Sequence, residues 1–285
     1  MGKPGFQDLI AHSPLFIPRW GSYLGRLEQR PTREIFENPV RLCMALRRTQ
    51  KLFALNAICV DIPPKRIICS DPSKVTEPRG DFKVMLEAHG GLNRIVEPAV
   101  GLFGYLPGPG NLSRAMARPS LTEAAWFELC RDTVFSLIRH LGEANIFTAV
   151  FIDEGMINTT EFSVDHCQAL RAIFNILAFY ELSALLIRQA PPDEGVELSW
   201  LEELSPTAVV FQSDRAILPK NPAFTGFTGR ALSPEFLAGG DDAVLRTISD
   251  MLEQGVAIVT TDGEVHPTIE PRTIHDLGRH IRDHT

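Results

Sequence analysis

The stretch "LTEAAWFELCRDTVFSLIRHLGEANIFTAVFID", residues 121–153, contains the unit from which the fold is built. Residues 121–144 have the pattern of a helix, and Thr122 places a hydroxyl oxygen where the first amides of that helix need an acceptor. Thr148–Asp153 is a short apolar run that ends in a carboxylate, as a buried strand would. A helix followed by such a strand is typical of parallel β/α folds.

The same alternation runs through the whole chain. Eight apolar runs are predicted to be strands: Leu15–Arg19, Ala57–Asp61, Ala99–Gly104, Thr148–Asp153, Ala184–Arg188, Ala208–Gln212, Phe224–Phe227 and Val256–Thr260. The clearest helices are predicted over residues 32–55, 121–144, 163–182, 241–255 and 270–284, with Pro39 splitting the first near Asn38. Eight strands in 285 residues fit one (β/α)8 barrel better than an open doubly wound sheet. We predict a single domain, residues 1–285, with a long loop over residues 63–98 at the barrel mouth.

Composition limits the classes of function. Hydrophobic residues make up 44% of the chain and charged residues 22%, which is typical of a folded, water-soluble protein. A net charge of −7 and a pI near 5.6 argue against nucleic-acid or anionic-membrane partners. The sequence shows no signal-peptide pattern and no apolar run of about 18 residues, and its five scattered cysteines indicate reduced thiols. We therefore expect a cytoplasmic protein.

Polar side chains follow the predicted strands, where the mouth of a (β/α)8 barrel carries its active site. In strand order these are Arg19 and Trp20, Asp61, Tyr105, Asp153 and Glu154, Arg188 and Gln189, Gln212 to Asp214, Thr228 to Arg230, and Thr261 and Asp262. An ionisable group directly after a buried apolar run is costly unless it has a partner, so we expect several of them to face one polar cavity. The alternative is that they are strand-end caps and salt bridges within the barrel.

The residue types suggest roles. Arg19 and Arg188 offer guanidinium groups that grip a carboxylate, and Asp61 can carry a proton or stabilise a cationic intermediate. Asp153 and Glu154 are adjacent, so only one of them can point inward from a strand end, and either could be that one. No metal-binding or nucleotide-binding motif is recognised, and we expect no cofactor.

The carboxyl-terminal part resembles the uroporphyrinogen decarboxylase superfamily. Residues 225–283, "TGFTGRALSPEFLAGGDDAVLRTISDMLEQGVAIVTTDGEVHPTIEPRTIHDLGRHIRD", are similar to the last quarter of that superfamily, with Gly229–Pro234 at the position of its Gly-Asn-Leu-Asp-Pro turn. The segment "VGLFGYLPGPGNLSRAMA", residues 100–117, resembles its third strand and the turn after it. The resemblance implies a (β/α)8 barrel and suggests a homodimer.

Two upstream segments extend the resemblance. "LFALNAICVDIPP" is similar to the family's second strand, which implies the main catalytic role for Asp61. "IPRWGSYLGRL" resembles the family's Arg-Gln-Ala-Gly-Arg-Tyr segment, with Arg19 at the first arginine and Tyr23 or Arg26 at the second.

The chain also departs from the family. Asp262-Gly263-Glu264 replaces the family's Gly-His-Gly, so the substrate-contacting histidine is missing unless His266 substitutes for it. The cobamide-dependent methyltransferases of the same superfamily bind zinc through histidine and two cysteines, yet no cysteine follows Cys167 here.

We therefore predict a cofactor-independent lyase, decarboxylase-like, that acts on a small carboxylated, aromatic or heteroaromatic metabolite. The alternatives are a methyltransferase or demethylase of the same superfamily without the thiolate zinc site, and a non-catalytic ligand-binding barrel. Asp61, Arg19 and Tyr105 are predicted to be catalytic. The predicted substrate-binding residues are Arg26, Tyr23, Arg188, Gln212, Gly229, Arg230, Asp153, Glu154 and His266.

Overall fold

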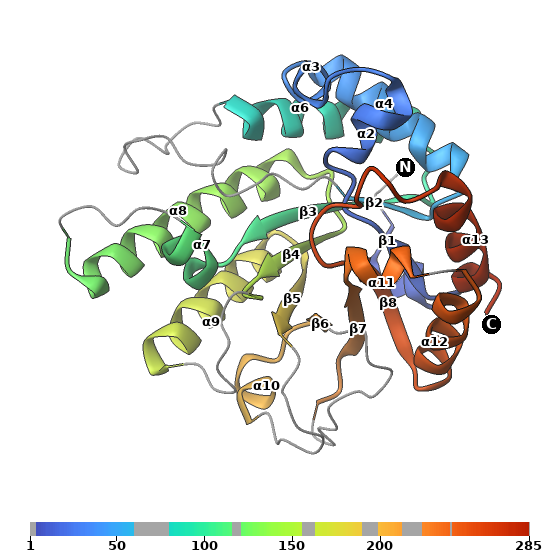
Figure 1. Ribbon diagram of the computed structural model, residues 1–285. Helices are drawn as coiled ribbons and strands as arrows, with labels where there is room; N and C mark the ends of the chain where they lie inside the picture. Colours follow the sequence, from blue (N-terminus) through green and yellow to red (C-terminus); the bar gives the residue numbers. More distant parts are fainter. Residues whose placement is uncertain are drawn as a thin grey trace.

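Eight parallel strands form the centre of the molecule in a computed structural model (Figure 1), which describes residues 4–59, 80–115, 121–155, 163–189, 199–212, 224–239 and 241–284. The strands are β1 (Leu15–Ile17), β2 (Ala57–Cys59), β3 (Gly101–Pro107), β4 (Ala149–Asp153), β5 (Ser183–Gln189), β6 (Ala208–Gln212), β7 (Phe227–Leu232) and β8 (Val256–Thr261). They hydrogen-bond in the order β1-β8-β7-β6-β5-β4-β3-β2. Because β1 and β2, the two ends of that order, also lie in contact, the sheet curls into a nearly closed (β/α)8 barrel, as predicted.

Helices surround the barrel (Figure 1). They are α1 (Phe6–Ile10), α2 (Tyr23–Glu28), α3 (Thr32–Phe36), α4 (Pro39–Leu52), α6 (Gly80–Ile95), α7 (Pro109–Ala115), α8 (Glu123–Ala144), α9 (Val164–Phe179), α10 (Ser199–Leu204), α11 (Pro234–Ala238), α12 (Asp241–Glu253) and α13 (Pro271–Arg282). The predicted break at Pro39 is confirmed, because the Asn38 side chain caps α4 and Pro39 is its first residue. Thr122 caps α8 through the Ala125 amide, also as predicted.

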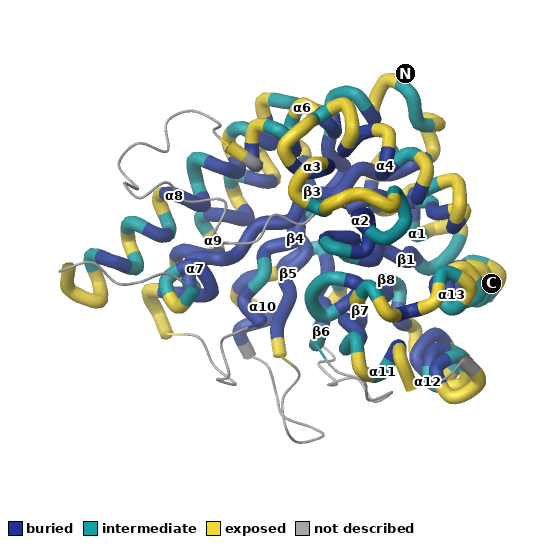
Figure 2. The backbone as a smooth tube through the Cα atoms, turned by 45° about the horizontal axis from the view of Figure 1, so that its top comes forward, coloured by how far each residue is buried: buried dark blue, intermediate teal, exposed yellow. Residues whose placement is uncertain are grey.

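The strand residues divide into two packed layers. Side chains such as Phe103, Phe151 and Val210 fill the barrel interior, and α1 closes its amino-terminal end by packing Phe6 against Phe103 and Phe227. The alternate side chains face outward and join the helices in the larger core. Figure 2 shows the consequence, with buried strands in the middle and exposed residues on the outer faces of the helices.

Two predicted elements were wrong. The seventh strand was expected at Phe224–Phe227 but runs over Phe227–Leu232, so Thr228, Gly229 and Arg230 lie within the strand instead of after it. The polar letters of "FTGRAL" do not look like a buried strand, although its last four residues are buried. Residues 80–95, expected to be part of a loop, form helix α6.

The turn after α4 gives a direct test of the backbone geometry. Ala54 has φ of +50°, which places an exposed alanine in the left-handed region, and its N–H returns to the Lys51 carbonyl to end the helix. A Cβ there costs about 1 kcal/mol, so Ala54→Gly should raise the free energy of unfolding by roughly 0.5–1 kcal/mol. Urea denaturation measures this, with Ala172→Gly inside α9 as the control that should lower it by about 1 kcal/mol. Destabilisation by both glycines would contradict the assigned backbone conformation.

A buried histidine makes stability depend on pH. His89 of α6 is fully buried, its Nδ1 donates to the Met85 carbonyl at 2.9 Å, and its ring packs on Phe147 at 4.8 Å between centroids. Its Nε2 makes no hydrogen bond to any residue that the structure describes. Burial lowers the pKa of His89 from 6.5 to about 4.

The unfolded chain therefore binds a proton on His89 that the folded chain excludes between pH 6.5 and 4. The stabilisation due to neutral His89 is complete above pH 6.5, falls as the pH drops to 4 and amounts to about 3 kcal/mol. His89→Leu should remove this part of the pH dependence, measured as the free energy of unfolding at pH 7 and pH 4. The exposed-site control His275→Gln should keep it, and an equal loss in wild type and His89→Leu would contradict the prediction.

Candidate active site at the barrel mouth

Three predicted site residues face the interior at the carboxyl ends of their strands. Tyr105 belongs to the cluster of interior side chains. Asp153 stands opposite Ile187, and Gln212 stands opposite Ala231, and both of these partners are interior residues. The strand register therefore carries Tyr105, Asp153 and Gln212 to one mouth.

Arg19 joins two of these residues. Its guanidinium carbon lies 4.0 Å from the centroid of the Tyr105 ring, and its Nη1 lies 4.0 Å from Oδ2 of Asp153. The Tyr105 hydroxyl donates to the same Oδ2, and the Gly155 amide donates to Oδ1 at 2.8 Å. The side chains of Arg19 and Asp153 are 11% and 14% exposed, so the group is shielded from bulk water yet still reachable. Such a setting strengthens charge interactions with a ligand.

The chain after β8 fixes the backbone of Arg19. The Arg19 N–H donates to Oγ1 of Thr261 at 3.0 Å, and the Arg19 carbonyl accepts from the Val265 amide at 2.7 Å. Oε2 of Glu264 accepts from the Ser22 amide at 2.7 Å. The stacked guanidinium therefore rests on a rigid support, the arrangement that a binding residue needs.

Gly21 makes these contacts between the loop after β1 and the chain after β8 possible. It has φ of +35°, and a Cβ at this position would overlap the Glu264 carboxyl group. Glu264 thus occupies the region where the family resemblance puts a histidine. Its carboxylate accepts a hydrogen bond from the backbone of the loop after β1.

A second polar pair lies beside the first. Nε2 of Gln212 donates to Oδ1 of Asp262 at 2.8 Å. The Gly155 amide donates to Asp153, and the Gln212 side-chain amide lies directly against Gly155. A Cβ at position 155 would overlap that amide. The mouth group comprises Arg19, Tyr105, Asp153, Gln212 and Asp262. Asp262 is not among the site residues that the sequence predicts, but its place directly after β8 is the signal for a role at the mouth.

Glu154 turns the other way. It is fully buried outside the barrel wall, where its Oε1 accepts from the Gly110 amide at 3.0 Å and its Oε2 from the Asn111 amide at 2.8 Å. Nε2 of His166 lies 2.8 Å from Oε1. Of the adjacent carboxylates, Asp153 therefore points inward, and Glu154 ties α7 and α9 to the barrel.

Two of the other predicted arginines, Arg188 and Arg230, also face outward. Arg188 and Arg230 stand on either side of Phe211 in the strand register, and Phe211 belongs to the outer core. The guanidinium of Arg188 lies 5.4 Å from the Trp200 ring, and that of Arg230 lies 5.9 Å from the Phe211 ring. Burial lowers the pKa of each to about 10, with the charge of Glu154 opposing that effect at Arg188. They do not join the mouth group.

Tyr23 and Arg26 anchor α2 to the chain after β8. The Tyr23 hydroxyl donates to the Ile269 carbonyl at 3.0 Å, and burial raises the pKa of Tyr23 to about 12. Nη1 of Arg26 donates to the carbonyls of Pro267 and Ile269, each at 2.5 Å, and its Nη2 pairs with Glu270 at 2.9 Å. These contacts are separate from the mouth group.

The remaining predicted residues lie elsewhere. His266 is exposed, with its Nδ1 2.7 Å from the Thr268 hydroxyl. Gly229 lies inside the barrel, where a Cβ would come within 2.9 Å of Val210 and Ile258, so close strand packing explains this glycine. Asp61 lies outside the described residues.

Comparisons with known proteins support the fold. No known family and no curated protein sequence matches the chain. Among solved structures, a methyltransferase from Methanosarcina mazei is similar at 14% identity and a TM-score of 0.73, over 97% of this chain and 96% of that one. A B12-independent methionine synthase from Shewanella sp. W3-18-1 is similar at 12% identity and a TM-score of 0.56, over 86% and 87%. At these identities the likeness shows a shared fold.

The described part of the chain holds no group of three or more histidine, cysteine, aspartate or glutamate side chains placed to bind a metal ion. None of its helices has the length and apolarity needed to cross a membrane.

Proposed function

We propose that the protein is an enzyme that binds a small carboxylated metabolite at the barrel mouth and removes a carboxyl group from it. The observation that carries this proposal is the contact of Arg19 with both Tyr105 and Asp153 at the carboxyl ends of the strands. That set combines a cation for a substrate carboxylate with a hydrogen-bonded pair that can move a proton. The resemblance to decarboxylases supports the same class of reaction.

In this mechanism Arg19 holds the substrate by a carboxylate, and stacking on Tyr105 fixes the plane of its guanidinium. The bond between the substrate carbon and the departing carboxyl group breaks, its electron pair stays on that carbon, and CO2 leaves. A proton from the Tyr105–Asp153 pair then adds to the carbon, and solvent water returns a proton to the pair after CO2 and product leave. Asp61 keeps the stabilising role that the resemblance implies, as a proposed residue outside the described part of the chain.

Methyl transfer is the second candidate, because the similar structure from Methanosarcina mazei is a methyltransferase. No cysteine follows Cys167 in this chain, so the acceptor would be activated without the paired thiolates of the cobamide-dependent enzymes. Arg19 and Asp262 would then orient a charged acceptor at the mouth. Product analysis separates the candidates, since one releases CO2 and the other consumes a methyl donor.

Arg19→Ala tests the carboxylate site. A panel of aromatic, heteroaromatic and aliphatic carboxylic acids is screened by thermal shift, because a ligand at a hundred times its Kd adds about 2.7 kcal/mol of stability. At least one acid should stabilise the wild type, and Arg19→Ala should bind it at least tenfold more weakly. Arg33→Ala, at a side chain that is 80% exposed on α3, is the matched control. Unchanged binding in Arg19→Ala would refute the site, and binding without CO2 release or methyl transfer would indicate a ligand-binding barrel.

A further inference from the structure

Gln212 is held in one position at the barrel mouth. It is the last residue of β6 and faces the interior, because it stands opposite Ala231, an interior residue. Its Nε2 donates to Oδ1 of Asp262 at 2.8 Å, and its side-chain amide lies against the backbone of Gly155. Asp262 and Gly155 belong to distant segments of the chain, so the amide is fixed from two sides.

The contact with Asp262 decides which way the amide faces. A carboxylate oxygen accepts hydrogen bonds, so the nitrogen of the amide faces Asp262 and Oε1 points away from it. Oε1 accepts no hydrogen bond from the residues that the structure describes, and it is not among their buried atoms without a partner. It is therefore open to solvent at the mouth. Gln212 thus offers a ligand one hydrogen-bond acceptor in a fixed direction.

This acceptor belongs to the same network as the proposed reaction centre. The Gly155 amide donates to Oδ1 of Asp153 at 2.8 Å, so the residue that supports Gln212 also binds the inward-facing carboxylate. Asp153 in turn contacts Tyr105 and Arg19. A small acid whose carboxylate lies on Arg19 therefore shares the mouth with Oε1 of Gln212.

An acceptor at this place restricts the substrate. A hydrocarbon group placed against Oε1 takes its water away and leaves the oxygen unpaired, whereas an N–H or O–H group replaces the hydrogen bond of that water. A site that hydrogen-bonds to a substrate group rejects analogues that lack the group.

We propose that Gln212 is a specificity-determining residue, which selects carboxylic acids that also carry an N–H or O–H donor. This role rests on the function proposed above and narrows the substrate class to amino-substituted, hydroxy-substituted or N–H heteroaromatic acids. Asp262 and Gly155 act through Gln212 as positioning residues, since both hold its amide.

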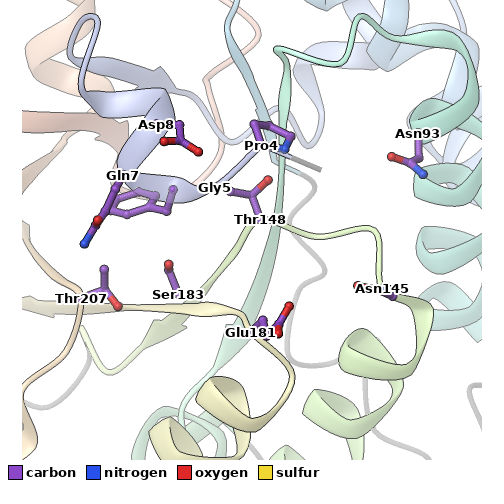
Figure 3. A pocket seen from close by; sticks show the side chains of 11 residues that line it. Pro4, Gly5, Gln7, Asp8, Asn93, Asn145, Thr148, Glu181, Ser183 and Thr207 are labelled. Carbon is purple, nitrogen blue, oxygen red and sulfur yellow. The ribbon is translucent and has the colours of Figure 1, made fainter. Parts of the chain in front are cut away.

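A cavity at the opposite end of the barrel does not suit an acid. It measures about 780 Å³ and is lined by α1 and by the turns that enter β4, β5 and β6 (Figure 3). Asp8 and Glu181 are the charged residues among its described lining, and both repel a carboxylate. Gln7, exposed on α1, also lines this cavity and so provides a matched control for Gln212.

Calorimetric titration with matched acids tests the donor requirement. Three pairs are used: 2-aminobenzoate with 2-methylbenzoate, imidazole-4-carboxylate with thiazole-4-carboxylate, and 3-hydroxybutanoate with 3-methylbutanoate. In each pair the second acid has nearly the shape of the first but lacks its N–H or O–H donor. The donor acid of at least one pair should bind the wild type about tenfold more tightly than its partner.

Gln212→Met keeps the length of the side chain, removes its polar atoms and should abolish this preference. Gln7→Met makes the same substitution at the opposite end of the barrel and should keep it. Equal binding within every pair in the wild type, or an unchanged preference in Gln212→Met, would overturn the role of Gln212 while leaving the carboxylate site in place. If none of the six acids binds, the carboxylate site fails and the role of Gln212 fails with it.

Gly155→Ala tests the support of the amide with Gln212 intact. A Cβ at position 155 would overlap the Gln212 amide, so the amide must move, whereas the backbone N–H that binds Asp153 remains. The preference within the pair should therefore fall, mainly through weaker binding of the donor acid. An unchanged preference would show that the fixed direction of Oε1 does not select the substrate, and it would overturn the proposal.

Discussion

Glu154→Ala is expected to lower the free energy of unfolding by about 4 kcal/mol. The carboxylate is fully buried and accepts hydrogen bonds from the amides of Gly110 and Asn111, and His166 contacts it from α9. Alanine would leave these groups in a dry interior without their acceptor, and removing one partner of a buried charged network costs 3–5 kcal/mol as an order of magnitude. Gly108 would also lose its packing partner, because it lies against the Glu154 carboxyl group.

Urea denaturation at pH 7 measures this loss. Glu154→Gln keeps one acceptor oxygen and should cost about half as much, which preserves the test if the alanine variant does not fold. Asp153→Ala is the neighbouring control, since that side chain is 14% exposed at the mouth and should cost less than about 2 kcal/mol. Equal costs at the two positions would contradict the assignment of Glu154 to the outer layer and Asp153 to the mouth.

This pair also shows what the sequence could not decide. The run "AVFI" before Asp153 is apolar at every position because a barrel strand is covered on both faces, so its letters do not reveal which face is the interior. From the sequence alone, Asp153 and Glu154 are therefore equal candidates for the inward-facing carboxylate. Only the register with β5, which puts Asp153 opposite Ile187, separates them.

The same ambiguity misplaced Arg188 and Arg230. Arg188 follows apolar residues and Arg230 follows the predicted seventh strand, so the sequence predicts both at the mouth. Both instead face outward, because in the strand register they stand beside Phe211. Short apolar runs predict the number of strands and the end of β6 at Gln212. The predicted ends of β1 and β3 were wrong, because β1 ends at Ile17 and β3 at Pro107. Arg19 and Tyr105 nevertheless lie close enough to those ends to reach the mouth. The sequence does not predict the hydrogen bonds that hold the backbone of Arg19, because one of them joins it to Thr261, more than two hundred residues away.

Asp153→Asn is expected to reduce kcat of the decarboxylation proposed here by at least a hundredfold. Asp153 accepts a hydrogen bond from the Tyr105 hydroxyl, and its Oδ2 lies 4.0 Å from Nη1 of Arg19, so it links the proposed proton donor to the carboxylate-binding cation. The amide keeps the shape but removes the charge and the capacity to take and return a proton, and general acid–base catalysis contributes about 10² to 10⁴ in rate. Binding of the substrate carboxylate should change much less, because Arg19 remains.

Steady-state kinetics on the acid identified by the Arg19 screen would measure kcat and KM separately. Tyr105→Phe is the companion variant, since it removes the hydroxyl but keeps the ring on which Arg19 stacks. If the pair moves the proton together, the two substitutions act on one step and their effects on kcat should not multiply in the double variant. Full additivity would mean that Tyr105 and Asp153 act separately, and an unchanged kcat in Asp153→Asn would remove Asp153 from the mechanism and leave it as a support for Arg19.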